Sequence, residues 1–403
     1  TKFNFKINGK KIKANGHLFT NKEFSNNLIK AGFEIIKIYP INYKNGKVMN
    51  NFLSGQLLYI AKIKQWVNKV GTMKKILVTG ACGFIGSHVV EKLCKKGFHV
   101  TAMAYYNPIN SNGWLDYLDK ETKRKIKIIR GDVRDFNFMY ASTKKIDVII
   151  HLAALIGIPY SYIAPESYVD TNVKGTLNVL NCAINNNISQ VIITSTSEVY
   201  GTAAKVPIKE KHPLNAQSPY AASKISADHL ALSYYKSFNL PVTILRPFNS
   251  FGPRQSSRAI IPTIISQMLN NKYVKIGNLK PTRDFTYVED TAASFVKAIN
   301  NKKSFGEIIN VGNSFEISIE NIIKILKEEF GYKFEVSIDK KRIRPLKSEV
   351  MRLYSSNLKA KKILNWEPKF KGLKGFKKGL EETISWLKKN KDSKYYNSKN
   401  YII

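Results

Sequence analysis

The chain has 403 residues and 43% of them are hydrophobic, which is enough for more than one domain with a buried core. It contains no apolar run of about 18 residues, so we expect no membrane-spanning helix, and its start lacks the apolar region of a signal peptide. Three cysteines occur without paired spacing, which predicts a reducing, cytoplasmic location and neither a disulfide scaffold nor a metal site: Cys82, Cys94 and Cys182.

The formal net charge of +36 raises the question of nucleic-acid binding. Lysines account for most of this charge and are spread along the whole chain, whereas a nucleic-acid site gathers basic residues on one face. We therefore expect a compositional bias and no nucleic-acid partner. The arginines are more informative, because a guanidinium group binds phosphate with two hydrogen bonds. Five of them fall in one half of the chain: Arg246, Arg254, Arg258, Arg283 and Arg344.

The first 72 residues have a pattern of their own. A helix capped by Thr20 or Asn21 and ended by Gly32 is predicted, followed by a strand, and residues 55–63 predict a second strand. This segment resembles the C-terminal end of a class I methyltransferase. No glycine-rich cofactor loop precedes it, so we expect a non-catalytic remnant or gene fusion, with a docking or dimerisation extension as the alternative.

From Lys74 onward, strands and helices alternate, which predicts an α/β fold with a doubly wound parallel sheet of Rossmann type. We expect this domain over 73–250, a smaller mixed α/β substrate region mainly over 251–390, and a flexible tail over 391–403. A C-terminal amphipathic helix is predicted, with Phe376, Leu380, Ile384 and Leu387 on one face. The predicted strands of the sheet are 75–79, 98–104, 125–130, 147–151, 190–195 and 242–246.

A glycine turn follows the first of these strands in the sequence VTGACGFIGSH. Gly80, Gly83 and Gly86 permit a tight bend and the close approach of a pyrophosphate, which would then lie at the N-terminus of the helix opened by Phe84 and Ile85. The sequence therefore predicts a dinucleotide cofactor. The next strand ends in AMAYYNPINSN, without the acid typical of NAD sites or the arginine typical of NADP sites, so we expect NAD and leave NADP open.

Two further strand ends complete the predicted cofactor site. In RGDVRD, Asp132 and Val133 are placed to meet the adenine, although an aspartate here also suits a turn or helix cap. In HLAA, the small residues after the fourth strand let a cofactor lie against the backbone: Leu152, Ala153 and Ala154.

The sequence SPYAASK places Tyr220 and Lys224 four residues apart, on one face of a predicted helix. A lysine ammonium beside a phenol lowers the pKa of the phenol. The pair would thus take a proton from a hydroxyl group while hydride leaves the same carbon.

These motifs together resemble the extended short-chain dehydrogenases/reductases, the NAD-dependent epimerase/dehydratase family, over about residues 74–390. The resemblance implies a nucleotide-sugar substrate and a homodimer formed through the helices of residues 175–185 and 222–238. The resemblance also implies substrate contacts in four stretches: LRPFNSFGPRQ, SSRAIIPTI, TRDFTYVED and IRPLKSEV. It further implies that Trp366 is a core residue. The implied substrate-binding residues are Asn249, Arg258, Arg283 and Arg344.

The triplet Thr196-Ser197-Glu198 separates the activities within this family. Epimerases usually carry Ser, Thr or Ala where Glu198 stands, whereas sugar 4,6-dehydratases carry Thr-Asp-Glu or Thr-Ser-Glu. We expect Thr196 to bind the developing C4 oxyanion, Glu198 to take the C5 proton, and Ser197 to occupy the place of a C6 acid. The alternative for Glu198 is a helix-capping or salt-bridged surface carboxylate.

The stretches HLAALIGIPYSYIAPESYVDTNVKGTLNVL, SSRAIIPTI and RPLKSEVMRL resemble the N-acetylglucosamine 4,6-dehydratases of legionaminic-acid-type synthesis, whose product feeds surface glycans. The expected substrate is therefore UDP- or GDP-N-acetylglucosamine. A GDP-mannose 4,6-dehydratase, a nucleotide-sugar 4-epimerase and a non-catalytic binding module are the alternatives.

Overall fold

The computed structural model describes residues 2–7, 10–15, 21–30, 33–42, 48, 56–63 and 73–390. The chain divides into two compact units, Thr1–Thr72 and Met73–Ile403. The tail predicted over 391–403 and the predicted caps Thr20 and Gly32 lie outside the described residues. Within the described ranges, no helix is both long and apolar enough to cross a membrane.

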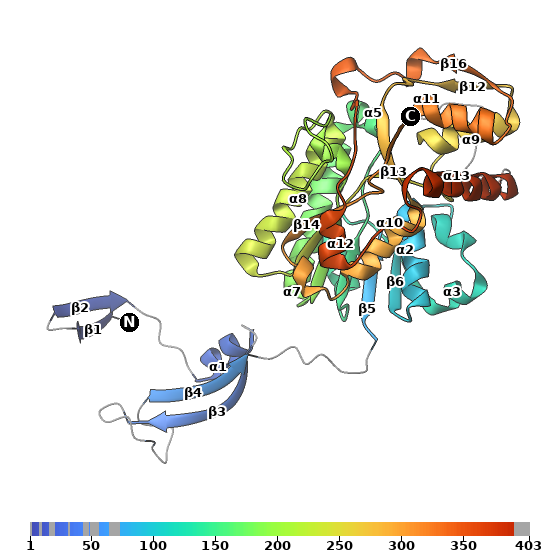
Figure 1. The fold of residues 1–403 in the computed structure, drawn as a ribbon. Coiled ribbons are helices and arrows are strands. Elements are labelled where there is room, and N and C mark those ends of the chain that lie inside the picture. The colour runs from blue at the N-terminus through green and yellow to red at the C-terminus, as the bar shows by residue number, and fades with distance from the viewer. Residues whose placement is uncertain are drawn as a thin grey trace. The chain divides into compact units, whose positions relative to one another are not determined.

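The described residues of the first unit form two antiparallel strand pairs and one helix (Figure 1). Its helix begins at Asn21, as the sequence predicts, and the strands that follow match the predicted helix–strand–strand order. Its elements are β1 (Lys2–Ile7), β2 (Lys10–Asn15), α1 (Asn21–Lys30), β3 (Phe33–Ile41) and β4 (Gln56–Ile63).

The second unit is built on a parallel sheet of seven strands in the order β14-β10-β9-β8-β5-β6-β7. The six predicted strands begin and end within one residue of the observed ones, and the seventh comes from beyond residue 250. The strands are β5 (Lys75–Thr79), β6 (His99–Tyr105), β7 (Ile126–Gly131), β8 (Val148–His151), β9 (Gln190–Thr194), β10 (Val242–Pro247) and β14 (Glu307–Val311).

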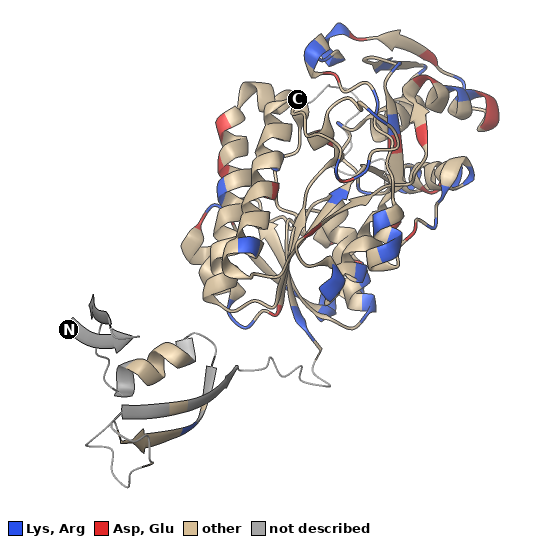
Figure 2. Cartoon of the chain, turned by 60° about the vertical axis from the view of Figure 1, so that its left-hand side comes forward, with Lys and Arg blue, Asp and Glu red and all other residues tan. Residues whose placement is uncertain are grey.

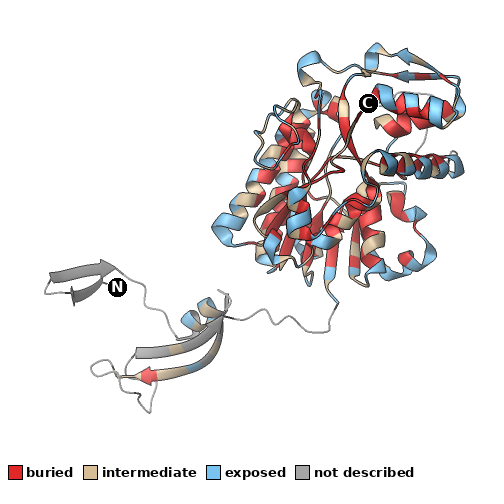
Figure 3. Cartoon of the chain, viewed as in Figure 1, coloured by how far each residue is buried: buried red, intermediate tan, exposed pale blue. Residues whose placement is uncertain are grey.

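Helices cover both faces of this sheet (Figure 1), so its central strands are buried along their length (Figure 3). This explains why they read as continuous β-branched runs and not as alternating patterns. One face carries α2 (Phe84–Lys95), α10 (Val288–Ala298) and α12 (Leu358–Leu364), with α3 (Lys120–Lys125) beside α2; the other carries α4 (Phe136–Thr143), α7 (Gly175–Asn185) and α8 (Pro219–Phe238).

A smaller region follows, with its own hydrophobic core. The predicted amphipathic face of α13 (Gly372–Lys389) is buried in that core, because Phe376, Leu380, Ile384 and Leu387 all pack there. The other elements of the region are β11 (Asn249–Phe251), α9 (Ile260–Asn270), β12 (Tyr273–Ile276), β13 (Thr282–Tyr287), β15 (Glu316–Ser318), α11 (Ile319–Lys324) and β16 (Glu335–Ile338).

Trp366 lies in the core of the α2 and α10 face, as the sequence predicts, and its Nε1 donates a hydrogen bond to the Asp290 carbonyl oxygen at 2.9 Å. Cys82, Cys94 and Cys182 are free thiols. Lysine and arginine residues occur on many elements of the second unit (Figure 2).

Candidate active site

The glycine turn after β5 packs tightly against the chain that follows β8. Gly80 has a φ of +66°, and a Cβ atom there would lie 2.6 Å from the Ala153 nitrogen and 2.8 Å from the Leu152 carbonyl carbon. A Cβ atom on Gly86 would in turn meet the Gly80 carbonyl oxygen, which is backbone and cannot move aside. Glycine is therefore required at both positions, and the turn and the Leu152–Ala154 segment form one surface.

The N-terminus of α2 is free to bind an anion. Gly83 is its N-cap and provides no side-chain cap, and the first turn, Phe84 to Gly86, holds no acidic residue. The first backbone N–H groups of a helix have no partner within it, and the helix dipole favours negative charge there. The turn and the helix start thus fit the pyrophosphate of a dinucleotide.

Asp132 follows β7 and is held by its neighbour Arg134. Its carboxylate accepts hydrogen bonds from the Arg134 backbone nitrogen and Nε, both at 2.9 Å, and from Nη2 at 2.6 Å. Burial alone would raise the pKa of Asp132, but these bonds outweigh it and keep the pKa below its ordinary value. Asp132 therefore closes a turn, and its predicted contact with adenine stays a prediction. Val133 is buried against Gly175 at the start of α7.

The end of β6 presents no carboxylate to a cofactor ribose. Tyr105 and Tyr106 are exposed there, and the Arg130 Nε donates to the Asn112 Oδ1 at 2.9 Å. A cavity of about 500 Å³ opens beside them, lined by Tyr106, Asn112, Ile128 and Arg130.

Beneath the loop after β8, a chain of hydrogen bonds fixes the proton positions of His151. The Thr176 hydroxyl donates to the Asn172 carbonyl oxygen at 2.6 Å, so it accepts from the His151 Nε2, and the Thr79 hydroxyl donates to Nδ1. Complete burial, together with the charge of Lys224, lowers the pKa of His151 to about 3. His151 is therefore a neutral structural link between β5, β8 and α7.

The predicted Tyr–Lys pair lies on one face of α8. Ser218 caps this helix by accepting a hydrogen bond from the Ala221 nitrogen, and both Tyr220 and Lys224 are buried. Tyr220 is hydrogen-bonded to the Thr196 side chain, and the Lys224 Nζ donates to the Thr194 carbonyl oxygen at 2.6 Å. The structure thus brings the pair to the carboxyl end of β9.

The pKa of Tyr220 is raised, which is opposite to the direction expected from the Tyr–Lys pair. Burial is the largest cause; the Thr196 hydrogen bond lowers the pKa, and the negative charge of Glu198 raises it further. Burial also lowers the pKa of Lys224 to about 8, against the opposing effect of Asp228. The sequence pattern predicts the contact between elements but not the cost of desolvating both groups.

Glu198 lies in η3 (Ser197–Tyr200), the short helix after β9. Its backbone nitrogen donates to the Thr196 hydroxyl at 3.2 Å, and the residue is only 8% exposed. Among the described residues, its carboxylate has no hydrogen-bond or ion-pair partner, although its charge acts on Tyr220 and on Arg283. Glu198 is therefore neither a helix cap nor a salt-bridged surface residue. Ser197 is buried beside it.

Two of the predicted substrate residues lie side by side at Glu349, and a third has an unsatisfied side-chain oxygen. Glu349 lies between two of them, with its Oε1 at 3.3 Å from the Arg283 Nη2 and 3.6 Å from the Arg344 Nη1. Asn249, on β11, has a buried side-chain oxygen without a hydrogen-bond partner.

Arg258 lies instead against the segment that follows β8. Its Nη1 is within about 4.0 Å of the Cβ position on Gly157, and its charge acts on Tyr168. The Tyr168 ring is 6.2 Å from the Tyr220 ring, centre to centre. Tyr168 ends α6 (Pro165–Tyr168), which follows α5 (Ile158–Ile163).

Two arginines of the basic half form ion pairs within the protein. Arg246 is 1% exposed and forms an ion pair of 2.8 Å with Asp228, while Arg254 pairs with Glu91 at the same distance. Asp228 is a functional candidate that the motifs did not indicate. A signal was present, because Asp228 stands four residues after Lys224 and thus on the same helix face.

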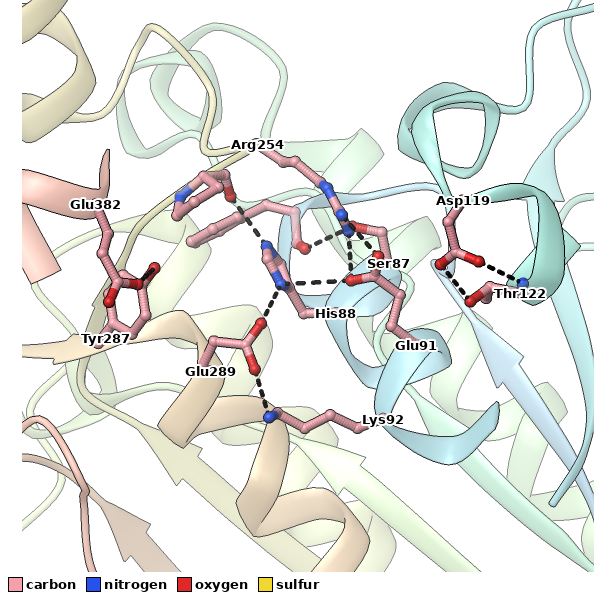
Figure 4. A network of polar contacts seen from close by, with 12 residues as sticks. Ser87, His88, Glu91, Lys92, Asp119, Thr122, Arg254, Tyr287, Glu289 and Glu382 are labelled. Atoms are coloured by element: carbon pink, nitrogen blue, oxygen red, sulfur yellow. Dashed lines mark hydrogen bonds and ion pairs between the residues drawn. The ribbon is translucent and has the colours of Figure 1, made fainter. Parts of the chain in front are cut away.

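Behind the cofactor helix, a polar network joins α2 to α10 and to the segment after β11 (Figure 4). The His88 ring nitrogens lie 3.1 Å from the Glu289 Oε1 and 3.1 Å from the Pro253 carbonyl oxygen. The ring thus links α2 to α10 and to the segment after β11. His88, Glu91 and Glu289 also have the spacing of metal ligands, but Lys92 pairs with Glu289 and Arg254 with Glu91. The cluster is an ion-pair network that orients α2.

Residues 77–383 match the model of the family described as GDP-mannose 4,6 dehydratase. The chain belongs to the NAD-dependent epimerase/dehydratase family of short-chain dehydrogenases/reductases. It is 32% identical to the human dTDP-D-glucose 4,6-dehydratase over 352 residues, which covers 83% of this chain and 95% of that protein. It is 34% identical to the UDP-glucuronate 4-epimerase of Thermodesulfobacterium geofontis, covering 78% of this chain and 96% of that one.

Solved structures of this family show the same mixture of activities. DesIV of Streptomyces venezuelae, a dTDP-glucose 4,6-dehydratase crystallised as a double mutant with NAD, is 26% identical and superposes with a TM-score of 0.71, covering 79% of this chain and 98% of that chain. The UDP-glucuronic acid 4-epimerase of Bacillus cereus, with UDP-glucuronic acid and NAD, is 31% identical with a TM-score of 0.70, covering 78% and 99%. Overall similarity therefore shows a nucleotide-sugar enzyme family and leaves the choice between dehydration and epimerisation to the site.

Proposed function

We propose that this protein is an NAD-dependent nucleotide-sugar 4,6-dehydratase. The observation that carries the proposal is Glu198, a residue only 8% exposed whose carboxylate has no hydrogen-bond or ion-pair partner among the described residues, and whose charge raises the pKa of the Tyr220 phenol. Burying a carboxylate without a partner is unfavourable, so it is retained where chemistry needs it. A 4-epimerase removes no C5 proton and has no use for such a group.

Tyr220, Thr196 and Lys224 act at C4 of the sugar. The Tyr220 oxygen takes the proton of the C4 hydroxyl, and Thr196, already hydrogen-bonded to Tyr220, supports the oxygen as it becomes a carbonyl. Lys224 is held by the Thr194 carbonyl oxygen, so its ammonium stays at the end of β9. NAD, when bound, supplies the oxidation at C4 and the later reduction at C6, and its positive ring favours the phenolate form of Tyr220.

Glu198 acts once C4 is a ketone. The C5 proton is then acidified, and the Glu198 carboxylate takes it while the C6–O bond breaks and a double bond forms between C5 and C6. Ser197 is a poor acid, so Glu198 returns that proton to the departing hydroxyl, and one molecule of water leaves. The proton that C5 regains on reduction at C6 would then come from solvent. Because the residue is 8% exposed, bulk water competes little for the proton.

The diphosphate of the substrate binds to Arg283 and Arg344, which Glu349 holds side by side. Guanidinium groups suit this role because they remain charged and bind phosphate oxygens with two hydrogen bonds. Asn249 offers its unpartnered side-chain oxygen to the substrate, and Arg258 approaches from the Tyr168 side.

UDP- or GDP-N-acetylglucosamine is the substrate we propose, on the resemblance of the stretches after His151, Ser256 and Arg344 to legionaminic-acid-type dehydratases. The product would then serve surface-glycan synthesis. We also propose a homodimer through α7 and α8 and a reducing, cytoplasmic location, with which the free thiols accord. The methyltransferase resemblance of residues 1–72 stays a prediction.

Substitution of Glu198→Gln tests the proposal. Glutamine keeps the size of the side chain but cannot take a proton, so we expect oxidation at C4 without loss of water. Reduced NAD, read at 340 nm, should rise and then remain, because no acceptor forms at C6. Glu210→Gln is the matched control, since a glutamine oxygen can still accept the hydrogen bond from the Asn310 nitrogen.

Two results would contradict the proposal. The first is a Glu198→Gln protein that turns over at the wild-type rate. The second is a wild-type protein that interconverts sugars of equal mass, which would establish the 4-epimerase, the second candidate that the relatives support.

A further inference from the structure

A buried polar network lies directly beneath the catalytic residues and has no place in the steps above. Its centre is the ion pair of Asp228 and Arg246, each 1% exposed. The Arg246 Nε and Nη2 lie 3.0 and 2.8 Å from the Asp228 Oδ2, and the Ser195 hydroxyl donates to the same oxygen at 2.7 Å.

The network reaches every element that carries a catalytic group. Ser195 directly precedes Thr196 at the end of β9. The Arg246 Nη1 donates to the Tyr200 hydroxyl at 2.9 Å, and Tyr200 ends the short helix η3 that holds Glu198. Asp228 itself lies one turn of α8 beyond Lys224. A shift of any one element would therefore break a buried hydrogen bond.

The Asp228 carboxylate is not fully satisfied by these contacts. All three donors converge on Oδ2, while Oδ1 is buried and has no hydrogen-bond partner among the described residues. Part of the negative charge of Asp228 is thus not neutralised by hydrogen bonds and acts on neighbouring buried groups. This charge acts on Lys224, because Asp228 raises the pKa of Lys224 and so opposes the effect of burial.

We propose that Asp228 is a positioning residue: through Arg246 and Ser195 it aligns the catalytic elements, and its negative charge, one turn of α8 from Lys224, acts on the Lys224 ammonium. The proposal rests on the catalytic roles of Tyr220 and Lys224 in the proposed function. It does not depend on Glu198, because the oxidation at C4 is common to dehydratases and 4-epimerases.

The sign of the effect follows from the charges. Removing the negative charge of Asp228 makes the Lys224 ammonium lose its proton at lower pH. It also lowers the pKa of Tyr220, which Asp228 raises. The acid limit of activity, set by Tyr220, and the alkaline limit, set by Lys224, should therefore both move to lower pH. The other titratable or charged groups around these residues are His151, Tyr168, Glu198, Tyr200, Glu210 and Arg246.

The test is the pH profile of kcat/KM for the full chain carrying Asp228→Asn. We expect both limits to move toward lower pH by about one unit or more, a tenfold change in proton affinity. Because this variant leaves Arg246 unpaired and can fail to fold, Asp228→Asn combined with Arg246→Gln removes both charges and should show a smaller shift in the same direction. Ser195→Ala should lower kcat and leave both limits in place, since it alters alignment without altering charge.

Asp290→Asn is the matched control, because Asp290 is a buried carboxylate that accepts a hydrogen bond from the Phe370 nitrogen. Both pH limits should stay at their wild-type positions in this variant. Unchanged limits in the Asp228 variants, a shift to higher pH, or an equal shift in Asp290→Asn would overturn the proposal. So would a Ser195→Ala protein with wild-type kcat. The profile can be read from any product, so failure of the dehydratase assignment would leave this test standing.

Discussion

Replacing Gly80 by alanine probes the tight packing of the glycine turn after β5 against the loop after β8. The residue has a φ of +66°, and an alanine in that region costs about 1–2 kcal/mol. The new Cβ atom would also lie 2.6 Å from the Ala153 nitrogen and 2.8 Å from the Leu152 carbonyl carbon, where overpacking costs about 1–3 kcal/mol more. We therefore expect Gly80→Ala to lower the free energy of unfolding by about 2–5 kcal/mol.

Gly331 provides a matched control for this substitution. Its φ is +71°, but nothing lies within 4 Å of its Cβ position, so Gly331→Ala carries the backbone strain without the clash. Urea unfolding of both variants, with NAD titrated by fluorescence, separates the two effects. Gly80→Ala should be the less stable protein and should lose NAD affinity, whereas Gly331→Ala should bind NAD normally. Equal stability and equal NAD affinity would refute the close approach of the β5 turn to the β8 loop.

Three further predictions concern the site and its support. Lys224 has a pKa of about 8, so kcat/KM should fall as the pH rises through that value and the ammonium deprotonates; in Lys224→Arg, rate profiles should show this limit moved beyond the accessible range. Arg246→Met leaves Asp228 buried without its partner and should cost about 3–5 kcal/mol in urea unfolding, of which the added Asp228→Asn should restore a part. Trp366→Phe removes the donor to the Asp290 carbonyl oxygen and should cost about 1–3 kcal/mol by the same measurement. Wild-type behaviour in any of these variants would contradict the contact concerned.

The sheet was predictable because local patterns determine it. Its strands are β-branched runs buried on both faces, and six of them begin and end within one residue of prediction. The seventh, Glu307–Val311, was missed because only its long-range pairing with β10 shows that it belongs to the sheet. No local pattern in a short strand specifies its partner.

The placement of the proposed catalytic residues was predictable from spacing and order, but their energetics were not. Tyr220 and Lys224 share a helix face by their four-residue separation, whereas the raised pKa of Tyr220 depends on how many other segments bury it. Asp132 shows the same limit, since its hydrogen bonds to Arg134 depend on the local turn. The ion pair of Asp228 and Arg246 joins a helix to a strand 18 residues away. No feature of the sequence identifies either residue as the partner of the other.

Dehydration at C5 and C6 is the central claim, and the most direct measurement follows mass and isotope together. The purified protein would be incubated in deuterated water with NAD and separate nucleotide sugars, led by UDP- and GDP-N-acetylglucosamine and GDP-mannose, and the products analysed by mass spectrometry. We expect one of these sugars to lose one molecule of water and to gain one solvent deuteron at C5. A product of unchanged mass, with the sugar inverted at C4, would show an epimerase and would contradict the role given to Glu198.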